Sequence, residues 1–295
     1  MRVPVIIALL SLPPAIHGQD SLSVPQCRKL IVGLGTPVVM AGSWIALDQA
    51  WYADYERSPF HGFDDGAEWA QMDKAGHIWS AYTLGRVGQR LFKWSGKSDR
   101  SALWMGGSLG LVYLTGVEVL DGTSSGWGFS AWDMAANVGG AALFIGQELA
   151  WKEQRITMKF SAHHTAFATL RPDLLGEGDM ERVLKDYNGQ TYWASCNLKA
   201  FLPRSRMPAW LNVAAGYGAE GMTNAHAWDT GSDVLRDHGA PFRQYFLSLD
   251  VDLTRIPSRS SFVRTVLFTL NCIKVPAPTL EFRSNGRVLG HGIYF

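Results

Sequence analysis

The stretches Asp73-Lys74-Ala75-Gly76-His77, Glu118-Val119-Leu120-Asp121-Gly122 and Asp133-Met134-Ala135-Ala136-Asn137 each place polar or ionisable side chains inside an apolar, helix-like run. In each stretch two polar residues stand three or four positions apart, so on a helix they share one face. If three helices pack by these faces, carboxylates, an imidazole, an ammonium and an amide meet in a region of low dielectric. Charged groups there must pair, bind a ligand or take part in chemistry. The sequence therefore predicts a buried polar cluster between helices.

The candidate site consists of the polar residues of these three stretches: Asp73, Lys74, His77, Glu118, Asp121, Asp133 and Asn137. Imidazole and carboxylates together suit zinc or a harder divalent cation. The same groups could act as general acid and base, or they could recognise a lipid headgroup or an envelope polymer.

A structural network is the remaining interpretation of this cluster. In it, Lys74 neutralises Glu118 or Asp133. His77 donates to a backbone carbonyl, and Asn137 satisfies a helix end. The chain has no standard metal-binding spacing and no nucleophile elbow, so the sequence names neither a cofactor nor a reaction.

The motif order along the chain is D-K-x-x-H, then E-x-x-D-G, then S-x-x-D-x-x-A-N-x-x-G. This order resembles the uncharacterised YfiM-like family of predicted periplasmic and envelope proteins. A weaker similarity links the first and third motifs to the VanZ-like membrane proteins. The resemblance extends over about Trp51 to Asn197. It implies an exported protein of the Gram-negative cell envelope, and it implies no activity because the family has none established.

The charge and composition of the chain limit its partners. It has 27 basic and 26 acidic residues among 295, a balance that predicts no nucleic-acid partner. Charged residues make up 18%, below the globular norm of about 25%, whereas Gly (31) and Trp (12) are abundant. Low charge with many small and indole side chains is typical of helices packed at a membrane. We therefore expect membrane lipid as a partner, with other envelope proteins as a second class.

Residues 1–18 have the composition of a secretory signal peptide: a basic start, an apolar run and a small-residue cleavage site before Gln19. No cysteine follows a lipobox, because Cys27 lies in a different context, so we expect no lipidation. Together with Cys196 and Cys272, the cysteines number three. An odd number with no metal-binding spacing predicts at most one disulfide.

Residues 28–155 are expected to form a membrane-associated bundle of about four apolar helices. The expected helices span residues 30–47, 67–92, 101–120 and 130–149. Asp64 and Asp65 are expected to cap the second helix, and Ser130 the fourth. The G-x-x-x-G pair Gly106–Gly110 is suited to close helix approach.

From residue 156 to 295 the apolar residues alternate with polar ones, which predicts an antiparallel β region of five or six strands. One amphipathic helix is expected near 262–273, and Asn285-Gly286 predicts a two-residue hairpin. An apolar and an acidic face, as in Tyr245–Leu253, is the pattern of an outer-membrane barrel strand. Because the strands are few, a curved sheet docked on the bundle is favoured over a closed barrel. The predicted fold class is α+β.

The leading hypothesis for function is a non-enzymatic structural or assembly component of the Gram-negative envelope. We expect it at the outer membrane or its periplasmic face, with the inner membrane as the alternative. The competing hypothesis is a hydrolase or transferase that acts on a lipid or cell-wall substrate through the buried His, Asp and Glu side chains.

Overall fold

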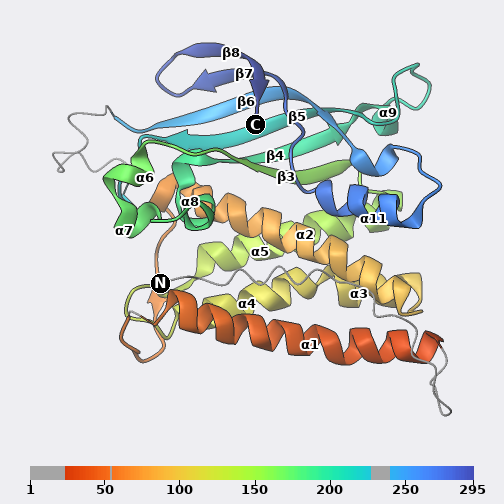
Figure 1. The fold of residues 1–295 in the computed structure, drawn as a ribbon, viewed down its shortest axis with the longest axis horizontal. Coiled ribbons are helices and arrows are strands. Elements are labelled where there is room, and N and C mark those ends of the chain that lie inside the picture. The colour runs from red at the N-terminus through yellow and green to blue at the C-terminus, as the bar shows by residue number, and fades with distance from the viewer. Residues whose placement is uncertain (1–23, 54, 227–239) are drawn as a thin grey trace.

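A layer of helices lies beneath a six-stranded sheet in the computed structural model, which describes residues 24–53, 55–226 and 240–295 (Figure 1). The predicted combination of helices with an antiparallel sheet is confirmed. The expected signal peptide, residues 1–18, lies outside the described residues.

The helical layer contains α1 (Val24–Trp51), α2 (Met72–Trp94), α3 (Asp99–Gly107), α4 (Leu109–Asp121) and α5 (Ala131–Trp151). The prediction of about four helices was wrong, because the helix expected at 101–120 is two helices that meet at Ser108. Side-chain caps explain where two of these helices begin. Ser98 Oγ accepts from Ser101 N at the start of α3, and Ser130 Oγ accepts from Asp133 N at the start of α5.

Shorter helical segments lie outside this layer: η1 (Glu68–Gln71), α6 (Phe167–Leu170), α7 (Pro172–Leu175), α8 (Asp179–Lys185), η2 (Tyr187–Gly189), α9 (Leu198–Phe201) and η3 (Leu253–Arg255). The amphipathic helix expected near 262–273 is α11 (Ser261–Leu270). A two-stranded parallel pair, β1 (Gly62–Phe63) and β2 (Phe129–Ser130), connects the loop before α2 to the start of α5.

Small residues set the distance between α2 and its neighbours. A Cβ added to Gly106 would lie 2.3 Å from the backbone N of Gln89 on α2. Cβ atoms added to Gly110 and Gly140 would each lie 2.3 Å from a carbonyl oxygen of α2. The helices therefore touch through backbone, as the G-x-x-x-G pattern predicts, and polar side chains on their facing sides are forced close together.

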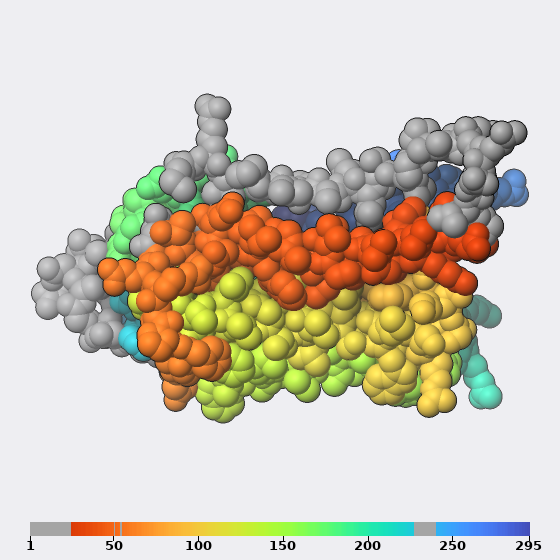
Figure 2. All heavy atoms as spheres, turned by 90° about the horizontal axis from the view of Figure 1, so that it is seen from below, coloured from red at the N-terminus to blue at the C-terminus, as the bar shows by residue number. Residues whose placement is uncertain are grey.

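Helix α1 forms the outermost ridge of the helical layer, lying across α4 and α3 (Figures 1 and 2). Val32 is buried against α2 and α3, and the Trp44 ring stacks on Tyr113 at 5.8 Å. Several of its other apolar side chains point outward, with Leu34 65% and Val38 68% exposed. By length and composition alone, two stretches among the described residues are apolar enough to cross a membrane: 25–49 in α1, and 99–121, which is α3 and α4 together.

The sheet is an antiparallel meander in the order β3-β4-β5-β6-β7-β8. Its strands are β3 (Ile156–Ala162), β4 (Gln190–Asn197), β5 (Leu211–Glu220), β6 (Phe242–Val251), β7 (Ala277–Arg283) and β8 (Val288–Tyr294). The predicted hairpin joins β7 to β8, where Gly286 has φ 85°. Strands β3 and β8 are not paired with each other, so the sheet does not close into the barrel that was the alternative.

The two faces of the sheet differ in chemistry. One face carries a row of aromatic residues in register: Tyr192 opposite Tyr217, Tyr217 opposite Tyr245, and Tyr245 opposite Phe282. Helix α2 covers the β3–β5 part of this face, where Trp79 packs on Phe160 and Tyr192. On β6 and β7 the apolar face is open: its exposed side chains are Tyr245, Leu247, Leu249, Leu280 and Phe282.

The opposite, polar face of the sheet is buried. Its side chains include Lys159, Ser195, Asn212, Asp250 and Glu281, each at most 1% exposed. The sheet coils on itself, because Tyr294 of β8 contacts Trp193 and Thr191 of β4. In a flat sheet, strands four places apart would be separated by about 19 Å. The polar side chains thus fill the inside of an open half-barrel, where they pair with one another.

Cys196, on β4, and Cys272, after α11, are free thiols in the described part of the chain. Cys27 lies within the first turn of α1.

Candidate functional site

Three helices supply six of the seven predicted residues to one cluster. Asp73, Lys74 and His77 come from α2, Glu118 from α4, and Asp133 and Asn137 from α5. The close approach of these helices at Gly110 and Gly140 brings the polar faces together.

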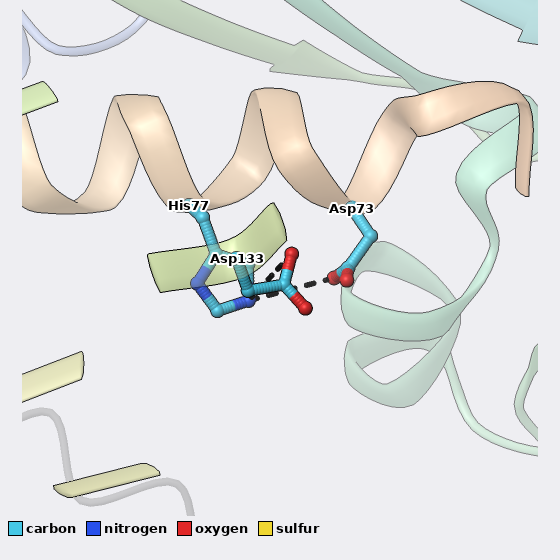
Figure 3. A group of neighbouring side chains, drawn as sticks. All are labelled: Asp73, His77 and Asp133. Atoms are coloured by element: carbon cyan, nitrogen blue, oxygen red, sulfur yellow. Dashed lines mark ion pairs between the residues drawn. The ribbon is translucent and has the colours of Figure 1, made fainter. Parts of the chain in front are cut away.

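His77 lies at the centre of the cluster. Its Nδ1 is 3.0 Å from Asn137 Oδ1, and because an amide oxygen only accepts, Nδ1 carries the proton. Nε2 then faces two carboxylates, at 3.7 Å from Asp73 Oδ1 and 4.0 Å from Asp133 Oδ1 (Figure 3). One ligand atom from each of these three residues lies within 4.8 Å of the other two. These separations are too long for hydrogen bonds, so the three atoms surround a position rather than contact one another.

Lys74 supplies the ammonium of the cluster. Its Nζ lies 2.5 Å from Asp65 Oδ2, 2.9 Å from Asp133 Oδ1 and 3.2 Å from Asp73 Oδ2. Lys74 was expected to pair with Glu118 or Asp133, and it pairs with Asp133. The partner expected for His77, a backbone carbonyl, is replaced by the Asn137 side chain, so that amide serves the imidazole rather than a helix end.

Negative charge exceeds positive charge in this region. Asp65 joins the four predicted carboxylates, and among the described residues of the cluster the single permanent cation is Lys74. Burial and the neighbouring charge of Asp73 raise the pKa of Asp133 to about 8. Burial alone would lower the pKa of His77, but Asp73, Asp133 and Glu118 raise it. The excess charge must be neutralised by protons or by a bound cation.

Three buried polar atoms of the cluster have no hydrogen-bond partner in the described part of the chain. They are Glu118 Oε1, Asp133 Oδ1 and Asn137 Nδ2, on side chains that are nearly inaccessible. Lys74 Nζ nevertheless lies 2.9 Å from the Asp133 oxygen and compensates its charge. Buried polar groups in folded proteins are nearly always satisfied, and an orphaned group calls for a ligand, a water or an ion.

Asp121, the seventh predicted residue, stands at the edge of the cluster. It lies one turn beyond Glu118 on α4 and accepts a hydrogen bond from the Tyr52 hydroxyl at 2.6 Å. Asp121 therefore stabilises the segment that follows α1, and its charge acts on the cluster only through space.

Sequence reasoning missed two residues that contact the cluster directly. The Tyr187 hydroxyl donates to Asp73 Oδ1 at 2.8 Å. Asp65 contacts Lys74 and accepts from Ser130 Oγ at 2.5 Å. Both stand in connecting segments, where helical spacing gives no signal.

The expectation that Asp64 and Asp65 cap α2 was wrong. The helix instead follows three residues with positive φ, Trp69 at 46°, Ala70 at 52° and Gln71 at 63°. Non-glycine residues in this conformation cost on the order of 1–3 kcal/mol each and occur often at functional sites. The sheet holds the turn in place, since the Tyr217 hydroxyl donates to the Ala70 carbonyl. This strained turn sets the position of the first turn of α2, which carries the site.

A small cleft of about 170 Å³ opens beside the cluster. Asp73 and His77 line it together with Leu114, Tyr187 and Tyr192. It gives the two polar groups a route to solvent between α2, α4 and the segment before β4.

Residues 62–146 match the model of a family described as predicted periplasmic lipoprotein (DUF2279). The matched region contains all seven predicted site residues and is shorter than the expected Trp51–Asn197. It confirms the resemblance at the level of a predicted periplasmic lipoprotein family of unknown function, whereas the YfiM-like assignment and the VanZ-like similarity stay predictions. No curated protein and no solved structure matches the chain.

Proposed function

We propose that this chain is a cell-envelope protein in which Asp73, His77 and Asp133 bind a divalent cation that ties α2 to α5. The family description and the apolar helix α1 support an exported protein held at a membrane. In this proposal the protein serves the Gram-negative envelope as a structural or assembly component.

The observation that carries the proposal is the arrangement around His77 Nε2. The Nε2 atom of His77 faces one oxygen of Asp73 and one of Asp133, within a cluster rich in negative charge. One imidazole nitrogen and two carboxylate oxygens form a donor set for zinc or a harder divalent ion. Asn137 accepts from the other ring nitrogen, as partners of metal-bound histidines do. The cation would also satisfy the orphaned oxygen of Asp133.

The test is thermal unfolding of the purified protein in detergent, first with EDTA and then with Zn²⁺ added. Zinc at about 100 times its dissociation constant stabilises a folded protein by about 2.7 kcal/mol, so the melting temperature should rise. Asp133→Asn should abolish most of this rise, because the amide is a poor ligand. The matched control is Asp173→Asn, which removes an exposed carboxylate. No rise for the wild type, or an equal rise for Asp133→Asn, would overturn the proposal.

A second candidate function is hydrolysis or group transfer on a lipid or cell-wall substrate. The observation that favours it is the cleft, which gives a substrate access to Asp73 and His77. In that case His77 acts as general base, with Asp73 holding the imidazolium that forms.

The two candidates predict different behaviour for His77→Gln. If the cation is structural, the variant loses the zinc-dependent rise in melting temperature, and hydrolysis of lipid or peptidoglycan substrates is absent in the wild type as well. If the site is catalytic, the wild type hydrolyses such a substrate and the variant keeps its fold while losing that activity.

A further inference from the structure

A second cleft lies at the other end of α2, away from the His77 cluster. Its volume is about 360 Å³, and α2, α5, β3 and the segment around α11 line it. Arg86 and Arg90, one helical turn apart on α2, present their guanidinium groups to the ring of Phe268 at 4.2 and 4.1 Å. Both arginines and Phe268 line this cleft, which we call the arginine cleft.

Arg86 is only 7% exposed, yet it forms no ion pair with any residue that the structure describes. The Phe268 carbonyl, at 2.5 Å, is the one hydrogen-bond acceptor found for it in the described part of the chain. A buried charge is unfavourable unless an opposite charge and hydrogen bonds compensate it. The guanidinium therefore has donors and charge to offer to an anion in the cleft.

The carboxylates that line the arginine cleft are already engaged. Glu148 accepts from Gln89 and Gln154. Glu153 and Asp252 both pair with Arg255, at 2.9 and 3.2 Å. Arg90 donates to the Thr265 hydroxyl, and burial lowers the pKa of Arg90, as do the neighbouring charges of Arg86 and Arg264. Four basic side chains line the cleft, Arg86, Arg90, Lys93 and Arg255, against the three carboxylates Glu148, Glu153 and Asp252. The lining therefore carries a small excess of positive charge.

An apolar helix face borders the same cleft. Helix α11 carries Phe268 and turns other apolar side chains outward, with Phe262 77% exposed and Val266 and Leu270 also open to solvent. Amphipathic helices that place apolar side chains beside arginines insert into the boundary between headgroups and acyl chains. The open apolar face thus suits the hydrocarbon part of the molecule whose anionic part would meet the arginines.

We propose that the arginine cleft binds the phosphate of an anionic phospholipid, with the acyl chains lying along the exposed face of α11. Arg86 and Arg90 contact the phosphate oxygens, since guanidinium groups match phosphate geometry. Phe268 holds both arginines in place. The site is separate from the His77 cluster and does not depend on the cation proposed there.

The test is co-sedimentation with phosphatidylcholine vesicles that either contain or lack phosphatidylglycerol, and the measured quantity is the ratio of the two affinities. This ratio removes the contribution of α1, which acts on both kinds of vesicle. A basic residue near an anionic surface is worth about 1 kcal/mol, or about fivefold in affinity. The double variant Arg90→Gln with Arg264→Gln should therefore lower the ratio by at least about tenfold. The matched control Arg100→Gln removes an exposed basic charge of α3, outside the cleft, and should change the ratio less than about twofold.

Two further variants separate a built site from general attraction to an anionic surface. Arg86→Lys keeps the charge but loses the planar fork, so the ratio should fall although the net charge is unchanged. Phe262→Ser, at an exposed position, should weaken binding to both kinds of vesicle without affecting the fold. Equal losses for the cleft variants and for Arg100→Gln would overturn the proposal. So would inorganic phosphate that binds as tightly as the vesicles, because the ligand would then be free phosphate rather than lipid.

Discussion

Asp250 of β6 is the carboxylate on which the interior of the half-barrel depends. Its Oδ2 lies 2.7 Å from Lys159 Nζ and its Oδ1 lies 3.9 Å from Lys274 Nζ, with all three side chains inaccessible to solvent. It also accepts from Ser195 Oγ at 2.6 Å and from the backbone N–H of Val275 at 3.1 Å. One carboxylate thus compensates two buried ammonium groups.

Asp250→Asn is nearly isosteric and leaves both lysines without a counter-charge. Removing one partner of a buried ion pair costs about 3–5 kcal/mol. Each lysine keeps a hydrogen bond to a backbone carbonyl at 2.7 Å, Lys159 to Val251 and Lys274 to Leu249, so the lower end of that range applies. We expect the free energy of unfolding to fall by about 3 kcal/mol, measured by urea unfolding in detergent with EDTA.

The matched control is the same substitution at the other buried cluster, Asp133→Asn. There Lys74 keeps Asp65 at 2.5 Å and Asp73 at 3.2 Å, and the change removes one carboxyl group from a cluster with too many of them. Without metal, Asp133→Asn should change the free energy of unfolding by less than about 1 kcal/mol or raise it. Replacing a residue that is kept for function often stabilises the fold. Equal losses for the two variants would refute this reasoning about charge balance.

Three further predictions concern packing, pH and the membrane. Gly106→Ala should destabilise the protein by about 1–3 kcal/mol or more, because the added Cβ meets the α2 backbone. Gly139→Ala, where a Cβ meets no other atom within 4 Å, should stabilise the protein by up to about 1 kcal/mol. Thermal unfolding of the two variants beside the wild type measures both effects. Burial lowers the pKa of Lys274 from 10.5 to about 8, so between these pH values the unfolded chain binds more protons than the folded one. The free energy of unfolding of the wild type, relative to that of Lys274→Met, should therefore rise with pH across this window. Urea titrations measure this difference, and a difference that stays constant would contradict the prediction. Leu34→Glu with Val38→Glu places charges on the exposed face of α1 and should release the protein from vesicles or detergent, as sedimentation would show; a wild type that is monodisperse without detergent would refute the membrane role.

Helical spacing alone predicted the cluster, because the pairs Asp73 with His77 and Asp133 with Asn137 are local features of single helices. Their partners from loops, Asp65 and Tyr187, could not be found in this way, since their positions depend on contacts between distant segments. The break of the third helix at Ser108 was also missed. It joins two apolar runs whose composition alone would continue as one helix.

Alternation predicted the strands and their two faces, but not which face would be buried. The apolar and acidic faces are the pattern of a barrel strand, with the acidic side chains toward the lumen, but the favoured docked sheet left open which face would be buried. In the fold the polar face lies inside. The reason is the coil of the sheet, which brings Tyr294 onto Trp193 and encloses Lys159 with Asp250. Such a coil follows from packing across four strands, and no local pattern encodes it.

Titration of Zn²⁺ into metal-free protein by calorimetry tests the central claim most directly. The geometry around His77 predicts one equivalent bound by the wild type and by Asp173→Asn, and none at the same concentrations by Asp133→Asn or His77→Gln. Wild-type protein that binds no zinc, or variants that bind it equally well, would contradict the assignment of this cluster as a cation site.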